Sequence, residues 1–420
     1  MSTRAARSRR FGVLVLCAVC LLPLAALAES AATPSRAAVT PVLAADPAVT
    51  AALAALGPNQ AVDLGKARIV GDLNDVARGF DLHRTGPRGR DYSIKMVWAP
   101  ERGRALFAGA NHGQPHRLND VWEFDLGALT WVLRYAPDNP RSYLGLGDDA
   151  SDVEYRDGVL RTQRGGPAVV GHTWWGLAYH PGIRRLLWMN IWSPDFDKLI
   201  AQVGGDPGTR YKGLPLWSFD PETALWELLR TSGSAPRAAF AGMLEYVDSL
   251  GDVVWHANNW QSRGTWRFDS RNMRWQDLAA KGQGGSFQSQ APTPEQVGYY
   301  DPKRDILVVQ RGRATFHFDV KQRTWAKVRA ELDGSPDVPV GHDARTPFLY
   351  DPTSGHGLLV DLRGNTIWAY DPGMHKWSKL DPQGAPMPHG KKRLAYVDPL
   401  QQVLVVIDGV RVWAYRHAPG

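Results

Sequence analysis

Side chains able to bind or act on a polar ligand gather in a few short segments of this 420-residue chain. The segments rich in histidine, arginine, asparagine and tryptophan are 111–117, 256–263, 311–313, 342–345 and 389–393. Guanidinium groups bind carboxylates through paired hydrogen bonds, so this set suits an anionic polar ligand. The candidate ligand-binding residues are Asn111, Asn258, Trp260, Arg263, Arg311 and Arg345. The candidate catalytic residues are His112, His172, His256 and Arg237.

No catalytic motif accompanies these residues. For each of them the alternative role is structural, as a polar residue that caps a strand or lies in a solvated loop. Beyond residue 28 the sequence has no G-x-S-x-G, no H-E-x-x-H, no phosphate-binding G-x-x-x-x-G-K and no dinucleotide fingerprint. The acidic run that contains Asp148 and Asp152 could bind Ca²⁺, but it lacks the regular spacing of a calcium loop. A solvated loop is the alternative for that run, and we expect no metal and no other cofactor.

The first 28 residues have the pattern of a secretory signal. Arginines precede the apolar stretch 11–24, and Ala26-Leu27-Ala28 fits a cleavage site. Ser8-Arg9-Arg10-Phe11 resembles a twin-arginine signal, so the general and the twin-arginine export routes both remain open. We therefore expect an exported protein, periplasmic or extracellular after cleavage. No segment has the about 20 apolar residues of a membrane span, so none is expected.

Composition excludes several classes of protein. With 44% apolar and 22% charged residues the chain is globular. Its net charge of +7 includes four arginines of the signal, and without them 45 basic residues face 42 acidic ones, or +3. That excess is too weak to indicate nucleic-acid binding. Both cysteines, Cys17 and Cys20, also lie in the signal, so we expect no disulfide and no cysteine-based site.

Residues 29–59 are rich in alanine and proline, and we expect them to form a tether. Within the tether, Asp46, Pro47 and Gly57 stand in the order of an N-cap, a first-turn proline and a helix stop. The sequence therefore predicts a short helix there, with a role in packing.

An internal repeat determines the predicted fold. A W-x-[FY]-D core with a second tryptophan six residues after the aspartate recurs in five segments, with Phe316 in place of the first tryptophan in one of them. These segments are 121–131, 216–226, 265–275, 315–325 and 367–377, and 412–415 is a truncated sixth copy. At a strict period such tryptophans indicate packing between sheets and not a sugar-binding surface.

Each copy follows a predicted β-hairpin, so each unit has four short antiparallel strands. The hairpins span 95–107, 176–189, 242–255, 297–309, 347–360 and 393–406. From Asp220 to Arg416 the units are spaced 49, 50, 52 and 45 residues apart, which is typical of propeller blades. We predict an all-β, six-bladed propeller over residues 60–420.

The last unit lacks its fourth strand. Segment 60–64 resembles strand segment 274–278, and we expect it to close the ring, because an open ring would leave an unpaired edge. The interval of 95 residues between Asp125 and Asp220 is twice the period, and it predicts one blade with insertions at 136–171 and 193–213. Both insertions leave on the same face, which we predict to be the binding face.

The repeated W-x-[FY]-D-x₅-W core resembles the Kelch and galactose-oxidase-like propellers over residues 60–420, although the family's Gly-Gly pair is mostly missing. The copper-radical site of galactose oxidase needs a tyrosine cross-linked to cysteine, which this sequence lacks beyond residue 28. The resemblance implies an exported scaffold that binds a glycan, a small polar ligand or a protein on its loop face. The alternative is a sugar-acting enzyme of the periplasmic Kelch-type epimerase or mutarotase kind.

Overall fold

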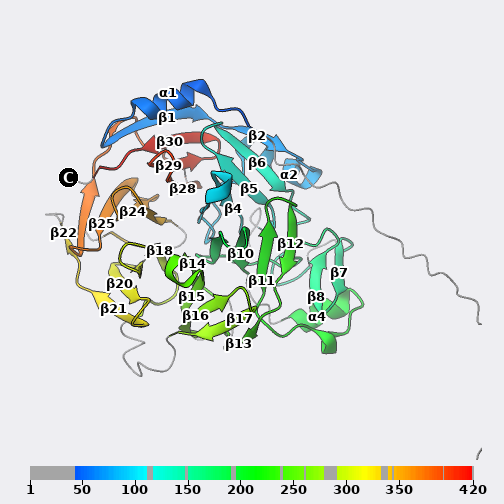
Figure 1. Ribbon diagram of the computed structural model, residues 1–420. Coiled ribbons are helices and arrows are strands. Elements are labelled where there is room, and N and C mark those ends of the chain that lie inside the picture. Colours follow the sequence, from blue (N-terminus) through cyan, green and yellow to red (C-terminus); the bar gives the residue numbers. More distant parts are fainter. Residues whose placement is uncertain are drawn as a thin grey trace, which may run out of the picture. The chain divides into compact units, whose positions relative to one another are not determined.

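The computed structural model describes residues 43–110, 117–146, 150–190, 195–236, 240–259, 262–278, 291–332, 339–342, 345–390 and 392–418. Their strands pair into one two-stranded sheet and six larger sheets, and the six larger ones stand around a central axis as the blades of a β-propeller (Figure 1). The innermost strand of each blade contacts the innermost strands of both neighbouring blades. The predicted all-β, six-bladed fold is confirmed.

Each blade has four antiparallel strands, which follow one another from the axis outwards. Blade 1 contains β3 (Val97–Ala99), β4 (Arg104–Phe107), β5 (Val121–Asp125) and β6 (Thr130–Tyr135). Blade 2 contains β9 (Leu177–His180), β10 (Arg185–Met189), β11 (Leu216–Asp220) and β12 (Leu225–Leu228). Blade 3 contains β14 (Met243–Val247), β15 (Asp252–Asn258), β16 (Arg263–Asp269) and β17 (Arg274–Asp277).

The second half of the ring repeats this order. Blade 4 contains β18 (Val297–Asp301), β19 (Ile306–Arg311), β20 (Ala314–Asp319) and β21 (Thr324–Val328). Blade 5 contains β23 (Phe348–Asp351), β24 (His356–Asp361), β25 (Thr366–Asp371) and β26 (Lys376–Leu380). Blade 6 contains β28 (Arg393–Asp398), β29 (Val403–Asp408), β30 (Arg411–Tyr415) and, from the other end of the chain, β1 (Gln60–Lys66).

The ring is closed by strands from the two ends of the propeller. Strand β1 pairs antiparallel with β30, with Ala61 opposite Tyr415 and Val62 opposite Ala414. In Figure 1 the blue β1 lies beside the red β30. The predicted closing strand is confirmed.

The prediction of four strands per blade was incomplete, because four blades carry a fifth, parallel strand at the outer edge. These strands are β2 (Arg68–Gly71), β13 (Ser232–Gly233), β22 (Glu331–Leu332) and β27 (Gln383–Gly384). Each belongs to the segment that leaves the preceding blade and passes the outer strand of the next one. Gly233 has φ +87, and a Cβ there would lie 2.4 Å from the carbonyl oxygen of Trp275, so only glycine fits this approach.

Short helices cover part of the rim. The helix predicted in the tether is α1 (Pro47–Ala55), in which Asp46 accepts hydrogen bonds from the first-turn amides and Val49 and Leu53 are buried. Arg416 donates to the carbonyl oxygens of Leu53 and Leu56, which fixes α1 to the C-terminal strand segment. Helices α2 (Asp75–Gly79) and α3 (Leu82–Thr85) follow β2.

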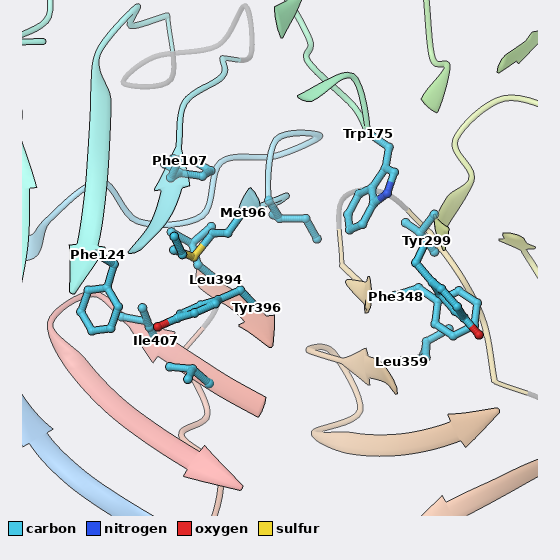
Figure 2. Packing of buried hydrophobic residues seen from close by; sticks show 14 of the residues in the cluster. Met96, Phe107, Phe124, Trp175, Tyr299, Phe348, Leu359, Leu394, Tyr396 and Ile407 are labelled. Carbon is cyan, nitrogen blue, oxygen red and sulfur yellow. The ribbon is translucent and has the colours of Figure 1, made fainter. Parts of the chain in front are cut away.

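Aromatic side chains fill the spaces between blades. Figure 2 shows Phe124 of blade 1 near Tyr396 of blade 6, and Tyr299 of blade 4 against Phe348 of blade 5. The outer-strand tryptophans add hydrogen bonds between neighbouring blades. Trp325 Nε1 donates to Thr265 Oγ1 over 2.9 Å, and Trp377 Nε1 donates to Thr315 Oγ1 over 3.1 Å.

These bonds depend on one position of the repeat. Where the preceding blade has Val121 or Leu216 in place of the threonine, the indole nitrogens of Trp226 and Trp275 are buried without an acceptor among the described residues. The repeat therefore gives the packing at every boundary, and a hydroxyl at this position adds the polar contact.

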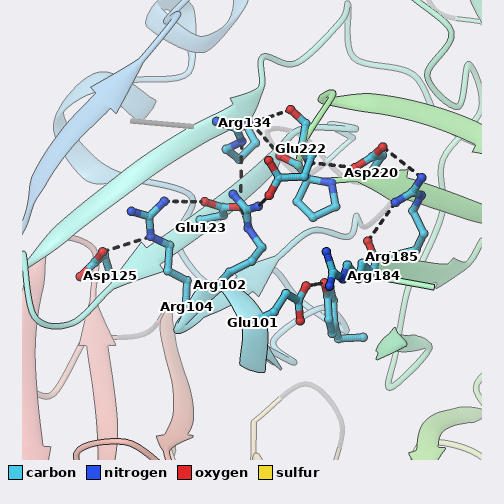
Figure 3. A network of polar contacts seen from close by, with 12 residues as sticks. Glu101, Arg102, Arg104, Glu123, Asp125, Arg134, Arg184, Arg185, Asp220 and Glu222 are labelled. Atoms are coloured by element: carbon cyan, nitrogen blue, oxygen red, sulfur yellow. Dashed lines mark hydrogen bonds and ion pairs between the residues drawn. The ribbon is translucent and has the colours of Figure 1, made fainter. Parts of the chain in front are cut away.

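Blades 1 and 2 are also joined by a polar network (Figure 3). Glu123 is fully buried and accepts hydrogen bonds from Arg102 and Arg104 at 2.6 and 3.0 Å. Arg102 also pairs with Glu222 of blade 2. A buried carboxylate needs such partners, since an unpaired charge is costly there.

The two insertions of blade 2 pack against each other. The first contains the hairpin β7 (Val153–Arg156) and β8 (Val159–Thr162), and the second contains α4 (Phe196–Gln202). Leu160, Leu199 and Ile200 are buried in their shared apolar cluster. The prediction of one blade with two insertions is confirmed.

Candidate functional site

Two sets of segments meet on the face that carries the insertions, which we call the insertion face. One set joins the outer strand of a blade to the inner strand of the next, and the other joins the second strand to the third. In an up-and-down blade both sets leave on the same side. The turns after the innermost strands lie on the opposite face.

Side chains from four blades meet near the axis on the insertion face, and we call them the axial cluster: Tyr92, His172, Glu295, Arg311 and His342. The ring of Tyr92 lies 4.7 Å from that of His172 and 5.9 Å from that of His342, between centroids. His342 Nε2 is 3.1 Å from Glu295 Oε2, and Arg311 Nη2 is 3.8 Å from the same oxygen. Residues of blades 1, 2, 4 and 5 can meet in this way only close to the axis.

The backbone in and beside the axial cluster is held in an uncommon conformation. Tyr92 has φ +58 and Trp174 has φ +49, in the left-handed region that L-residues rarely adopt. The amide of Trp174 donates to the carbonyl oxygen of Tyr92 over 2.5 Å, and its ring lies 4.9 Å from that of His172. Such strain persists where packing enforces it, and it is common at binding sites.

Charge and burial set the protonation of His342. Burial lowers its pKa, the carboxylate of Glu295 raises it, and Arg311 and Arg345 lower it again, with a net lowering. The imidazole is therefore mostly neutral near neutral pH and able to accept a proton, with Glu295 and Arg311 beside it. The cluster combines a base, a carboxylate and a guanidinium in one place.

A basic cleft of about 420 Å³ lies on the same face. Of the described residues that line it, only Asp91 is acidic, and the basic ones are Arg90, Arg345, Arg363, His389, Lys392 and Arg393. Arg90 and Arg393 belong to its wall, because both are buried. Arg90 pairs with Asp120 over 2.7 Å, and Arg393 donates to backbone carbonyl oxygens.

Arg345 and Arg363 are the ligand-facing members of the basic cleft. Both are exposed, and neither forms an ion pair with a carboxylate of the described residues. The charge of Arg345 contributes to the lowered pKa of His342, so the basic cleft and the axial cluster are electrostatically linked. Two exposed guanidinium groups at one cavity can hold a carboxylate, sulfate or phosphate group.

The structure brings some of the predicted residues together and separates others. His172, Arg311 and Arg345 belong to the axial cluster or the basic cleft. Arg263 is exposed at the start of β16 and lines neither. Asn111, His112, Arg237, Trp260 and Asp148 lie outside the described residues.

His256 and Asn258 are buried in blade 3, and neither lines the basic cleft. His256 bonds to Thr265 Oγ1 through Nδ1 and to the carbonyl oxygen of Pro292 through Nε2, and burial lowers its pKa to about 4. Asn258 donates to the carbonyl oxygen of Ala291. The segment looked like a loop in sequence, but β15 continues through it to Asn258.

The second calcium candidate, Asp152, pairs with the buried Arg141. No group of three metal-binding side chains occurs among the residues that the structure describes.

Sequence reasoning missed Tyr92 and Glu295. Both lie in segments that join one blade to the next, as His172 and His342 do. The signal was present, since the repeat locates these segments in every blade, but within them only histidines and arginines were taken as candidates. Extending it to all polar and aromatic residues of the joining segments would have found both.

Neither the models of known protein families nor the curated proteins gave a match to this chain. In the described part of the chain, no helix has the length and apolar character that crossing a bilayer requires.

Proposed function

We propose that this protein is an exported, Kelch-like propeller that binds an anionic sugar on its insertion face. The basic cleft would hold the carboxylate or other anionic group, and the axial cluster would contact the sugar ring. The observation that carries the proposal is the convergence of Arg345, Arg363 and Lys392 on one cavity with a single acidic residue, Asp91, among its described lining.

The electrostatics of Lys392 support an anionic ligand. Burial lowers its pKa, Asp91 raises it, and Arg88 and Arg90 lower it again, with a net lowering. Like charges therefore repel one another in the cleft, and a bound anion would relieve this repulsion. Such a ligand should raise the pKa of Lys392 and bind more weakly as the salt concentration rises.

The proposal predicts that glucuronate and N-acetylneuraminate bind the protein in isothermal titration calorimetry. Replacing Arg345 and Arg363 together with alanine should weaken binding by about 3–6 kcal/mol, since charged hydrogen bonds contribute about 1.5–3 kcal/mol each. Because both side chains are exposed, the melting temperature should stay unchanged. Arg274→Ala, at an exposed position of blade 3, is the matched control. Equal affinities of the double variant and the control would contradict the proposal, as would binding of acidic proteins alone.

A specific observation favours the enzymatic alternative, an epimerase or mutarotase that acts on the same sugar. Such an enzyme needs a proton-transferring group beside a charged partner, and His342, Glu295 and Arg311 form such a set. Exchange of the anomeric or epimeric forms of N-acetylneuraminate can be followed by NMR. If the protein is an enzyme, Glu295→Gln should abolish catalysed exchange while calorimetric binding remains. Exchange at the uncatalysed rate in the unmodified protein would exclude this alternative and leave the binding proposal intact.

A further inference from the structure

The face opposite the insertions has a cavity of its own, of about 330 Å³, which we call the basal cavity. Innermost strands of blades 1 to 5 line it, together with Pro100, Pro181, Asp248 and Pro302 from the turns that follow four of these strands. Its volume lies in the range of about 300–1,000 Å³ typical of small-molecule sites.

Aromatic side chains occupy the same position of the innermost strand in five successive blades, and we call them the aromatic ring: Trp98, Tyr179, Tyr246, Tyr300 and Tyr350. Their partners in the second strands occupy matching positions too, from Ala105 opposite Trp98 to Gly357 opposite Tyr350. The hydroxyls of Tyr179 and Tyr300 bond to Glu101 and Asp305. Those of Tyr246 and Tyr350 make no hydrogen bond to any described residue, so they remain available to a ligand.

The deep end of the basal cavity is a polar floor made by Lys95, Trp175 and Glu245, which come from three different blades. Lys95 Nζ donates to Glu245 Oε1 over 2.5 Å and lies 5.2 Å from the centre of a ring of Trp175. Trp175 Nε1 donates to the same carboxylate oxygen over 2.9 Å and to the carbonyl oxygen of Gly298 in blade 4 over 2.8 Å. These contacts cross the axis, so the cavity ends at this floor.

The charges at the deep end of this cavity favour a ligand group without net charge. Lys95 and Glu245 neutralise each other, which leaves Asp248 as the unbalanced charge among the lining residues. The ammonium of Lys95 would repel a cation there, and the carboxylates of Glu245 and Asp248 would repel an anion. Glu245 Oε2 makes no hydrogen bond to the described residues, and it can accept one from a ligand hydroxyl.

We propose that the basal cavity binds a neutral monosaccharide unit, free or at the end of a glycan. The C–H faces of the sugar ring would pack against the aromatic ring, and a hydroxyl would donate to Glu245 Oε2. This site lies on the other face from the basic cleft and does not depend on it.

Tryptophan fluorescence tests the proposal, since Trp98 and Trp175 both line the basal cavity. The full protein is titrated with glucose, galactose, mannose and N-acetylglucosamine, and with cellobiose, lactose and chitobiose as chain ends. Tetramethylammonium and glucuronate are the charged comparisons. We expect at least one neutral sugar to bind. Comparing the affinities for monosaccharides and disaccharides distinguishes a free sugar from the end of a glycan chain.

Variants locate the binding. Tyr350→Ala should weaken binding of the neutral sugar at least about tenfold, whereas Tyr350→Phe keeps the ring and should retain most of it. Tyr246→Ala is the second test if Tyr350→Ala does not fold, and Arg345→Ala should have no effect. The proposal is wrong if no neutral sugar binds, or if Tyr350→Ala weakens the binding of tetramethylammonium or glucuronate instead. It is also wrong if Arg345→Ala removes the binding of neutral sugars while Tyr350→Ala and Tyr246→Ala retain it.

Discussion

A single hydroxyl connects three side chains at the boundary between blades 3 and 4. Thr265 Oγ1 accepts from Trp325 Nε1 and bonds to His256 Nδ1, whose ring is 4.3 Å from that of Trp325. The carbonyl oxygen of Pro292 can only accept, so Nε2 of His256 carries a proton. Burial lowers the pKa of His256 to about 4, so the neutral ring accepts at Nδ1 from the hydroxyl of Thr265. This histidine is therefore neutral and structural.

Replacing Thr265 with valine keeps the branched shape and removes the hydroxyl. Trp325 Nε1 then loses its acceptor, and a buried donor without a partner costs about 1–3 kcal/mol. His256 Nδ1 loses its contact with this hydroxyl as well. We expect the free energy of unfolding in urea to fall by about that amount. Thr324→Val, at an exposed position of β21, should change it little. Equal effects of the two changes would contradict this account.

At the scale of residues, the sequence predicted packing better than polar contacts. The period of the tryptophans identified Trp325 and Trp377 as structural, because one residue type recurs at one spacing. The contact of His256 was not predicted, because its partner Pro292 lies 36 residues away in the segment that joins blades 3 and 4. No local pattern reports a contact of that kind.

Strand β1 is the element on which the closed ring depends. It lies between β30 and the short β27 in blade 6, so its removal exposes the edge of β30. Deleting residues 60–66 removes five paired positions with β30, and ladder hydrogen bonds contribute about 1 kcal/mol each. We expect the melting temperature in circular dichroism to fall sharply and the deleted protein to aggregate.

A milder change tests the same element without altering its length. Val62 pairs with Ala414 in the middle of β1, and proline there would remove a backbone donor from an interior strand. Val62→Pro should lower the melting temperature in the same direction. An unchanged melting temperature in both variants would mean that β1 does not hold the ring closed.

Element lengths explain which strands the sequence revealed. The first four strands of a blade are long enough for alternation and turn signals to appear, as in segment 297–319. Three of the four parallel edge strands have two residues each, and two residues contain no period. Gly233 and Gly384, both with positive φ, mark two of them, but isolated glycines are common in loops.

Across the whole molecule, the contacts at the axis depend on closure of the ring and on no local sequence pattern. Lys95 and Glu245 are 150 residues apart in sequence, and they meet only because blades 1 and 3 face the same axis. The repeat predicted the insertion face, because strand order fixes where each connection leaves. It did not predict which side chains would cross the axis, since that depends on their lengths and on the size of the ring.

Buried histidines give the whole propeller a predictable response to acid. Burial lowers the pKa values of His256, His317 and His417 to about 4, below the ordinary value of 6.5. The unfolded chain therefore binds protons that the folded chain does not, so this part of the stability is complete above pH 6.5 and is lost as the pH falls towards 4. Each histidine should contribute a loss of about 1.4 kcal/mol per pH unit within that window.

Urea unfolding between pH 7.5 and 5 measures this slope. Glu245 and Asp398, whose pKa values burial raises, act in the opposite direction, but only as they take up protons in the folded state. The contributions of Glu245 and Asp398 are the same in the His256→Asn variant and in the unmodified protein. The free energy of unfolding of the variant should therefore fall less steeply with pH, by the contribution of one histidine. The same slope in both proteins would show that His256 is protonated equally in the folded and unfolded states, and the chain of hydrogen bonds through Thr265 would then be wrong.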